Sequence, residues 1–280
     1  MKKKRLDLLL LELGLVSTRS RARGEIMAGH VYVDGKRQDK AGSLFSPEDN
    51  IELRVSPNPF VSRGGLKLQK ALLEFEIKMA GKIVLDIGAS TGGFTHCSLL
   101  YGAEKVYALD VGHGQLDLSL RRDSRVINIE RRNARLIKKE EFPESPDLVT
   151  MDVSFISLAL LLPVVAAFPV REIICLIKPQ FEAAPSQVGK NGVVKDPLIH
   201  REILLKIMRL AAGLSYEICG LTWSPLKGPK GNIEYLLYLK YLADNQEINY
   251  DNEKADKQAS ATITAAFLSL NAKAAEKGDI

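Results

Sequence analysis

The most constraining feature of this sequence is the segment VLDIGASTGGF at residues 84–94. An apolar run ends at Asp86, and glycines at 88, 92 and 93 follow before apolar residues resume. This order predicts a strand, a tight turn and the start of a helix, because glycine accepts positive φ and lets a ligand approach the backbone. The segment lacks the lysine of a P-loop and the GxGxxG spacing of dinucleotide binders. The acid at the strand end suits a cationic or hydroxyl-rich ligand better than a pyrophosphate.

A second acid follows the next predicted strand. Residues 105–109 form an apolar run, and Asp110 comes directly after it. At the carboxyl end of a neighbouring parallel strand, a carboxylate is placed to bind ribose hydroxyls. The glycine segment alone is also compatible with a plain strand-to-helix turn, and the second acid favours a ligand site over that alternative.

Together these features resemble the S-adenosylmethionine-dependent methyltransferases, whose first motif has the form of residues 86–92. The resemblance implies that S-adenosylmethionine is the cofactor and that the loop of residues 88–93 and Asp110 form its pocket. The cofactor-binding residues expected on this basis are Asp86, Gly88, Ala89, Ser90, Thr91, Gly92, Gly93, Phe94, Asp110 and Val111.

Apolar, strand-like runs alternate with helical patterns over residues 62–242. This alternation predicts an α/β domain with a parallel, doubly wound, Rossmann-like sheet, whose ligands lie at the carboxyl ends of the strands. Further strands are expected at 126–129, 148–151, 173–177, 217–221 and 235–239, and helices at 93–101, 113–121, 156–168 and 197–213.

The amino-terminal quarter is basic, whereas the rest of the chain is close to neutral. Residues 1–70 contain 14 lysines and arginines against 8 acids, and the other residues contain 25 against 26. Leucines at helical spacing, a second helix capped at Ser17 or Thr18, and strands around an Asp34-Gly35 turn predict a small α+β domain over residues 1–55. A basic domain beside a neutral one indicates a polyanionic substrate.

Residues 5–42 closely resemble the S4-type RNA-binding domain of a ribosomal small-subunit protein, pseudouridine synthases and tyrosyl-tRNA synthetases. Matching positions include Arg5-Leu6-Asp7 and Ser20-Arg21. The resemblance implies binding of structured RNA, in agreement with the charge distribution. The residues expected to contact RNA phosphates are Arg5, Arg19, Arg21, Arg23, Lys36 and Arg37.

Four charged residues stand out in the larger domain. Asp152 follows the strand LVTM, Lys178 follows IICLI, Glu234 precedes YLLYL, and Lys67 lies in SRGGLKLQKAL after a proline-containing linker at residues 56–61. Any one of them is compatible with a solvated strand end or an ion pair. As a set, Lys, Asp, Lys and Glu resemble the catalytic tetrad of the FtsJ-like ribose 2′-O-methyltransferases.

The chemistry of methyl transfer to a ribose explains this grouping. A ribose hydroxyl is a poor nucleophile, so the enzyme must orient it and remove its proton. Our hypothesis is that Lys178 is the base, that Asp152 and Glu234 position it and the sugar, and that Lys67 holds the hydroxyl or a phosphate. The sequence leaves the protonation state of Lys178 open.

Several longer runs narrow the resemblance to the TlyA group, which joins an S4-type domain to an FtsJ-like domain. They include SRGGLKL, DIGASTGGFT, DVGHGQL, MDVSFISL, IKPQFE and SPLKGPKGNIEY. The resemblance covers residues 5–242 and implies 2′-O-methylation of cytidines in 16S and 23S ribosomal RNA. It also implies that Asn133 and Ala134 lie near the adenine and that Asp152 borders the cofactor. It leaves open which nucleotide is modified and whether one or both ribosomal subunits are substrates.

Other classes of function are less consistent with the sequence. Members of this group are often called haemolysins, but the longest apolar stretches, such as residues 158–167, are shorter than the roughly 20 residues of a spanning helix. A non-catalytic ribosome-assembly factor would not need the tetrad and the glycine loop. Base methylation is disfavoured because DVSF stands where amino methyltransferases carry a proline-containing motif.

The remaining expectations concern the cell and the chain end. Three widely spaced cysteines indicate a reducing cytoplasm, and no spacing suits a metal. We expect a cytoplasmic protein that is monomeric when free and has ribosomal subunits as partners. Residues 243–280 are polar and alanine-rich, which predicts a tail with a disordered joint and a marginal helix over 256–275.

Overall fold

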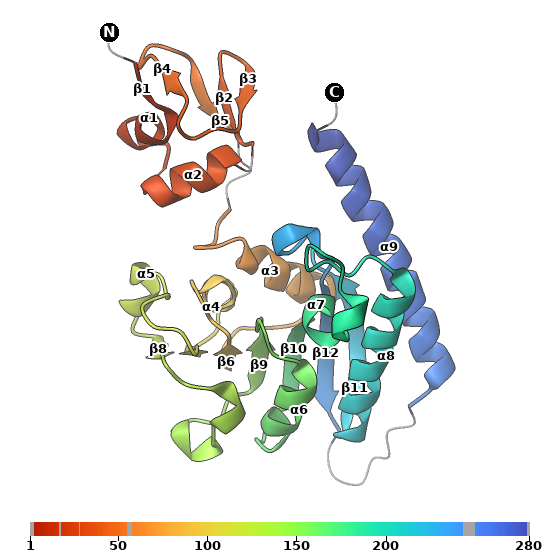
Figure 1. Cartoon of the computed structure of the whole chain (residues 1–280). Coiled ribbons are helices and arrows are strands. Elements are labelled where there is room, and N and C mark those ends of the chain that lie inside the picture. Colours follow the sequence, from red (N-terminus) through yellow and green to blue (C-terminus); the bar gives the residue numbers. More distant parts are fainter. Residues whose placement is uncertain (1–2, 17, 28, 55–57, 243–249, 279–280) are drawn as a thin grey trace. The chain divides into compact units, whose positions relative to one another are not determined.

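The chain divides into two compact units. A computed structural model describes residues 3–16, 18–27, 29–54, 58–242 and 250–278. One unit is Met1–Pro59 and the other is Phe60–Ile280, and the division falls inside the linker expected from the sequence (Figure 1). Each unit has its own hydrophobic core.

The smaller unit is a small α+β domain. Helices α1 (Leu6–Glu12) and α2 (Arg19–Met27) pack over a sheet of β2 (Val31–Val33), β3 (Lys36–Gln38) and β5 (Ile51–Leu53). A second, two-stranded sheet pairs β1 (Lys4–Arg5) with β4 (Leu44–Phe45). Thr18 caps α2 by accepting a hydrogen bond from the backbone N–H of Arg21. The turn between β2 and β3 has positive φ at Asp34 and Gly35, as the hairpin prediction requires.

A seven-stranded sheet organises the larger unit, in the order β11-β12-β10-β9-β6-β7-β8. Five neighbouring strands, from β10 to β8, are parallel, whereas β12 runs antiparallel to both of its neighbours. The prediction of a parallel sheet therefore holds for five strands and is wrong for β12. The strands are β6 (Ile83–Ile87), β7 (Lys105–Leu109), β8 (Val126–Ile129), β9 (Leu148–Met151), β10 (Glu172–Ile177), β11 (Tyr216–Trp223) and β12 (Tyr235–Tyr241).

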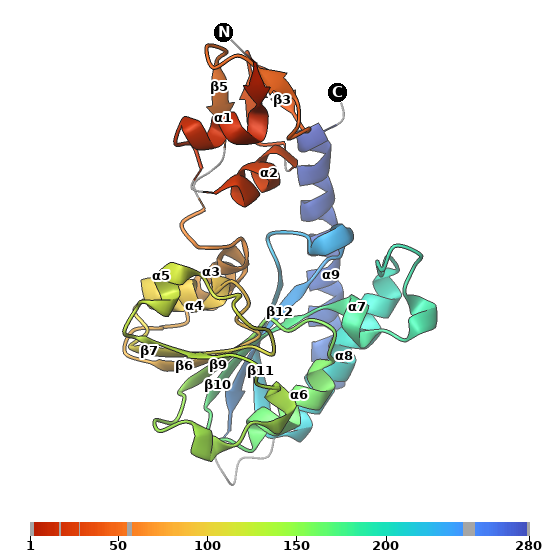
Figure 2. The same cartoon turned by 60° about the vertical axis from the view of Figure 1, so that its left-hand side comes forward.

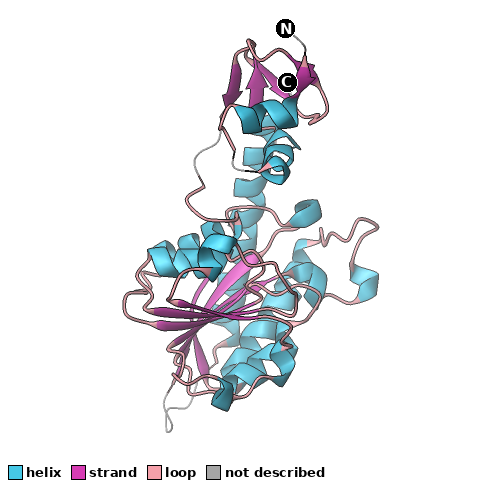
Figure 3. Ribbon diagram, turned by 90° about the vertical axis from the view of Figure 1, so that its left-hand side faces the viewer, coloured by secondary structure: helices cyan, strands magenta, loops and turns pink. Residues whose placement is uncertain are grey.

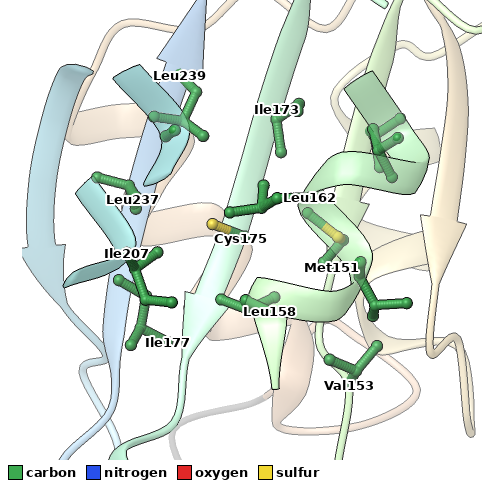
Figure 4. Close-up of a cluster of buried hydrophobic side chains, with 14 of the residues drawn as sticks. Met151, Val153, Leu158, Leu162, Ile173, Cys175, Ile177, Ile207, Leu237 and Leu239 are labelled. Carbon is green, nitrogen blue, oxygen red and sulfur yellow. The ribbon is translucent and has the colours of Figure 1, made fainter. Parts of the chain in front are cut away.

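Helices cover both faces of this sheet (Figure 3). One face packs on α3 (Gly64–Glu74) and α4 (Gly93–Leu100), and the other on α6 (Leu158–Ala166) and α8 (Pro197–Gly213). Alternate residues of β10 and β12 enter the two cores, which explains their continuous apolar runs. Figure 4 shows part of the core on the α6 and α8 face of the sheet, where Leu162 of α6 lies beside Cys175 of β10.

The helix expected over residues 113–121 is shorter than its pattern suggested. Only α5 (Leu118–Arg121) forms, and the Asp117 side chain caps it by accepting from the backbone N–H of Ser119. Gly112 and Gly114 precede it, and Gly114 has a φ of 70° that a helix does not allow. The remaining short elements are α7 (Pro179–Glu182) and 3₁₀ turns at Ala134–Leu136, Lys139–Glu141, Pro185–Gln187 and Pro229–Gly231.

The carboxyl-terminal helix is a packed part of the larger unit. Helix α9 spans Asn252–Gly278 and lies along α8 and β11 (Figures 1 and 2). Its buried stripe consists of Ala255, Ala259, Ile263, Ala266 and Leu270. The helix predicted over residues 256–275 is therefore present, but it is longer than expected and packed in the core rather than marginal, because its apolar residues share one face of the helix. The expected disordered joint falls on residues 243–249, which lie outside the described residues.

Among residues 3–16, 18–27, 29–54, 58–242 and 250–278, no helix combines the length and apolar character needed to span a bilayer.

Candidate active site

The glycine segment forms the turn between β6 and α4. Gly88 has a φ of 84°, and a Cβ at this position would lie 2.9 Å from the carbonyl oxygen of Asp152. A Cβ at Gly93 would lie 2.3 Å from Oγ of Ser62, just before α3. The glycines therefore let the loop touch both the end of β9 and the start of α3. As a result, segments that are far apart in the sequence meet at one edge of the sheet.

A cavity of about 650 Å³ opens at this edge. The glycine loop contributes one wall, and the ends of β9 and β10 and the segment before β12 contribute the others. The sequence-predicted residues that line it are Lys67, Gly88, Ala89, Ser90, Thr91, Gly93, Phe94, Asp152, Lys178 and Glu234.

All four charged residues of the predicted tetrad meet in this cavity as two ion pairs. Lys178 Nζ lies 2.6 Å from Oδ1 of Asp152, and Lys67 Nζ lies 2.7 Å from Oε2 of Glu234. A longer contact of 3.9 Å joins Lys67 to Asp152 and connects the pairs. The Glu234 side chain is fully buried, and that of Lys178 is 9% exposed. The two lysines and the two acids thus form one connected cluster of largely buried side chains at the wall of the cavity.

The antiparallel direction of β12 explains how Glu234 reaches the others. Lys178 follows the last residue of β10, whereas Glu234 precedes the first residue of β12. Ile177 and Tyr235 are register partners in the antiparallel pair, so the residues just beyond them lie at the same edge. In a fully parallel sheet, Glu234 would lie at the opposite edge.

Two residues that line the cavity, Ser154 and Gln180, were not predicted from the sequence. Ser154 Oγ lies 3.0 Å from Lys178 Nζ, and Gln180 Nε2 lies 3.3 Å from Oε1 of Glu234. Both belong to the runs MDVSFISL and IKPQFE, which support the family resemblance. Their positions beside Asp152 and Lys178 in these runs could have identified them from the sequence. Other additional lining residues are Ser62, Arg63, Gly64, Phe155, Phe181, Val188, Gly192, Leu226, Lys227, Gly228, Lys230 and Asn232.

Phe155 is a highly exposed lining residue. The residue is 90% exposed, and its φ of 63° is unusual for a residue other than glycine. The ring lies 5.0 Å from the ring of Phe181, whose centroid is 6.0 Å from Lys178 Nζ. An aromatic surface therefore stands beside the buried lysine.

Other residues expected at the cofactor lie next to this cavity. Asp110 accepts hydrogen bonds from the backbone N–H groups of Ser90 and Gly112, so its carboxylate ties the glycine loop to the turn after β7. Val111 beside it is 73% exposed. Asn133 lines a neighbouring pocket and caps the 3₁₀ turn that begins at Ala134. Gly92 adopts a φ of 94° at the N-cap of α4 but does not line the cavity.

Asp86 is placed differently from the expectation. Its carboxylate is fully buried beneath the loop and does not line the cavity. It accepts hydrogen bonds from the hydroxyls of Thr95 at 2.6 Å and Thr150 at 2.8 Å. Asp86 therefore connects β6, α4 and β9. Burial, which these bonds only partly offset, raises the pKa of Asp86 to about 6.

This raised pKa predicts a specific dependence of stability on pH. Because the folded pKa lies above the unfolded value, the native state binds the proton more tightly, and the group adds stability as pH falls through 6. Between pH 7 and pH 5 the wild type should gain about 1 kcal/mol of unfolding free energy relative to Asp86→Asn. Urea unfolding of both proteins across this range measures the difference. A difference that stays constant with pH would contradict the assignment.

The basic residues expected to contact RNA have different partners within the smaller unit. Arg5, Arg19 and Arg23 surround the buried carboxylate of Asp7. Arg21 instead approaches Glu25 at 3.9 Å. Lys36 and Arg37 are exposed on β3, where the Arg37 guanidinium lies against Gly29. The expected cationic residues thus form separate groups.

Comparison with known proteins identifies both units. The FtsJ-like methyltransferase family model matches residues 60–241, and the S4 domain model matches residues 4–51. The chain is 44% identical to the 16S/23S rRNA (cytidine-2′-O)-methyltransferase TlyA of Mycobacterium tuberculosis, over 86% of this chain and 91% of the relative. It is 43% identical to the candidate rRNA methyltransferase YqxC of Bacillus subtilis, over 98% of both proteins.

A solved structure agrees with these matches. A candidate hemolysin from Streptococcus thermophilus has a TM-score of 0.77 and 38% identity, and the match covers 98% of each chain. The family models and the high identity over most of the chain settle the classification. This chain belongs to the FtsJ-like methyltransferases, within the TlyA family, in which an S4 domain precedes the methyltransferase domain.

Proposed function

We propose that this protein transfers a methyl group from S-adenosylmethionine to the 2′-hydroxyl of a cytidine in 16S or 23S ribosomal RNA. The observation that carries the proposal is the cluster of Lys67, Asp152, Lys178 and Glu234 in one cavity with the glycine loop. Relatives at 40–44% identity carry the names 16S/23S or 23S rRNA (cytidine-2′-O)-methyltransferase. A ribosomal substrate agrees with the expected cytoplasmic location.

The cavity suits the cofactor. Gly88 and Gly93 have no Cβ to block the loop, and Asp110 has its carboxylate fixed by two backbone N–H groups. Asp110 would bind the ribose hydroxyls, while Asn133, Ala134 and the exposed Val111 would border the adenine. When bound, S-adenosylmethionine supplies a methyl group attached to a sulfonium sulfur. After the transfer this sulfur is a neutral thioether, so it needs no acid to leave.

The four charged residues would act on the acceptor hydroxyl. In its neutral form Lys178 takes the proton from the 2′-hydroxyl onto Nζ. Asp152, at 2.6 Å, then stabilises the ammonium that forms, and Ser154 limits the directions open to the lysine side chain. Lys67 is held by Glu234 and remains close enough to the cavity to bind the hydroxyl oxygen or an adjacent phosphate. Burial strengthens each of these interactions.

The decisive experiment offers radiolabelled S-adenosylmethionine and the purified protein to separated, unmodified ribosomal subunits. Nuclease digestion and mass spectrometry then map the product. We expect one methyl group on the ribose of a cytidine. Methyl on a base would refute the reaction type, and no transfer to either subunit would favour the alternative of a non-catalytic assembly factor.

The exposed Phe155 gives a prediction about the RNA. Methyl transfer inside a folded RNA requires a nucleotide that has left its stack. The Phe155 ring lies beside Phe181 and near Lys178, the proposed general base, so it is placed to stack on the nucleobase of that nucleotide. Phe155→Ala should raise KM for ribosomal subunits roughly tenfold, whereas Phe155→Trp should retain most of the affinity. Isothermal titration should show unchanged binding of S-adenosylmethionine in both variants. An unchanged KM for Phe155→Ala would exclude stacking at this position.

A further inference from the structure

A buried aspartate lies at the centre of an arginine cluster in the smaller unit. Asp7, in the first turn of α1, is fully buried. Arg5 donates two hydrogen bonds to it, through Nε at 3.0 Å to Oδ1 and through Nη2 at 3.2 Å to Oδ2. Arg19 and Arg23 each donate through Nε to Oδ2, at 3.0 and 3.2 Å. Four hydrogen bonds from three guanidinium groups thus converge on one carboxylate.

The charges in this cluster do not cancel. Three guanidinium groups meet one carboxylate, which leaves an excess of two positive charges. Hydrogen bonding and attraction from the arginines, led by Arg5, hold the pKa of Asp7 well below its usual range, so it is ionised. Each arginine side chain remains 42–52% exposed. The carboxylate is hidden from solvent, while the cationic groups around it are not.

Helical geometry separates this cluster from the neighbouring arginine. Arg19 and Arg23 are four residues apart on α2 and share the face that packs toward α1. Arg21 lies between them in sequence and points away, toward Glu25. Without an anion between them, three guanidinium groups this close would repel one another. Asp7 therefore allows a density of positive charge that the arginines would not adopt alone.

We propose that Asp7 is a positioning residue, which joins three of the arginines already expected at RNA phosphates, Arg5, Arg19 and Arg23, into one preorganised site. Asp7 binds Nε of each arginine and also Nη2 of Arg5. The terminal nitrogens of Arg19 and Arg23, whose side chains are half-exposed, would then donate to a phosphate together. The arginines are already ordered before RNA arrives, so binding does not have to immobilise three long side chains. This inference rests on the proposed RNA substrate and specifies how the S4 domain would hold it.

The test is whether Asp7→Asn raises or lowers the affinity for ribosomal subunits. Asp7→Asn removes a negative charge, so if the arginines acted only as a diffuse cationic surface, the full-length variant would bind unmodified ribosomal subunits more tightly. The positioning role predicts the opposite, an affinity about tenfold lower. KM for the subunits should rise by the same factor, with kcat and the KM for S-adenosylmethionine unchanged. Glu12→Gln is the matched control, because it removes an equal charge from an exposed pair with Lys4.

A second variant tests the same site without changing a buried residue, in case Asp7→Asn does not fold. The double variant Arg19→Lys, Arg23→Lys keeps the charge and changes only half-exposed side chains. It should also weaken subunit binding about tenfold because lysine lacks the fork of donors, while the slope of log affinity against log salt stays nearly unchanged because the charge is kept. Arg54→Lys is its control, because Arg54 also donates through Nε to a carboxylate, that of Glu52, but lies away from Asp7.

The possible outcomes separate the two proposals. If the wild type neither binds nor methylates ribosomal subunits, the proposed function fails. If the wild type binds and methylates them, but Asp7→Asn and the double lysine variant bind as tightly or more tightly, the phosphate site is refuted and the proposed function stands. Weaker binding by both, with normal Glu12→Gln and Arg54→Lys proteins, supports the site.

Discussion

Replacing Lys178 with alanine is expected to lower kcat for methyl transfer by about 10²–10⁴-fold, the usual contribution of a general base. The lysine is the only group in the proposed mechanism that takes the hydroxyl proton, and its side chain is only 9% exposed. The KM for S-adenosylmethionine should change little. Single-turnover transfer to unmodified ribosomal subunits, together with titration of the cofactor, measures both quantities.

The Lys178→Arg variant distinguishes a base from a fixed positive charge. Arginine keeps the ion pair with Asp152 but stays protonated, so it should be as inactive as the alanine variant. Substantial activity in Lys178→Arg would show that the charge, not proton transfer, is what matters. Lys206→Ala serves as the control, because Lys206 lies on α8 and does not line the cavity.

Replacing Ile263 with alanine is expected to cost about 2–4 kcal/mol of unfolding free energy. Ile263 is 5% exposed and lies in the middle of the α9 stripe, in the same core as α8 and β11. For a domain of this size, the midpoint of thermal unfolding should fall by roughly 5–15 °C. Calorimetry of the full-length protein measures it.

The control for this prediction lies on the same helix. Leu268 is 69% exposed, so Leu268→Ala should leave the unfolding transition almost unchanged. Equal effects of the two substitutions, or none from Ile263→Ala, would mean that α9 is not part of the folded core. In that case the boundary at residue 242 expected from the sequence would be the correct one.

Local patterns were sufficient for most of the sheet. Strands β6, β7, β9 and β10 are buried on both faces, so their apolar runs are continuous and easy to recognise. The glycine loop was equally clear because its backbone geometry requires glycine at specific positions. The prediction of a helix over residues 113–117 was wrong, because a helical pattern of side chains does not override the glycines at 112 and 114.

Two acids with similar sequence contexts lie in different environments in the structure. Asp86 and Asp152 both end or follow an apolar strand, yet Asp86 is enclosed by two threonines while Asp152 faces the cavity. The side chains of a strand alternate between its faces, and the neighbours on each face come from distant segments. The sequence therefore identified acids at strand ends, but not which of them face the cavity.

The sequence by itself determined the strand-loop-helix of the glycine segment, the S4 domain and the identities of Lys67, Asp152, Lys178 and Glu234. These features depend on short-range backbone geometry and on recognisable runs of residues. Only the tertiary structure decided that β12 runs antiparallel, that α9 completes a core, and that Asp7 gathers three arginines. Strand direction, helix docking and buried ion pairs depend on contacts between residues far apart in the chain, which a local pattern does not encode.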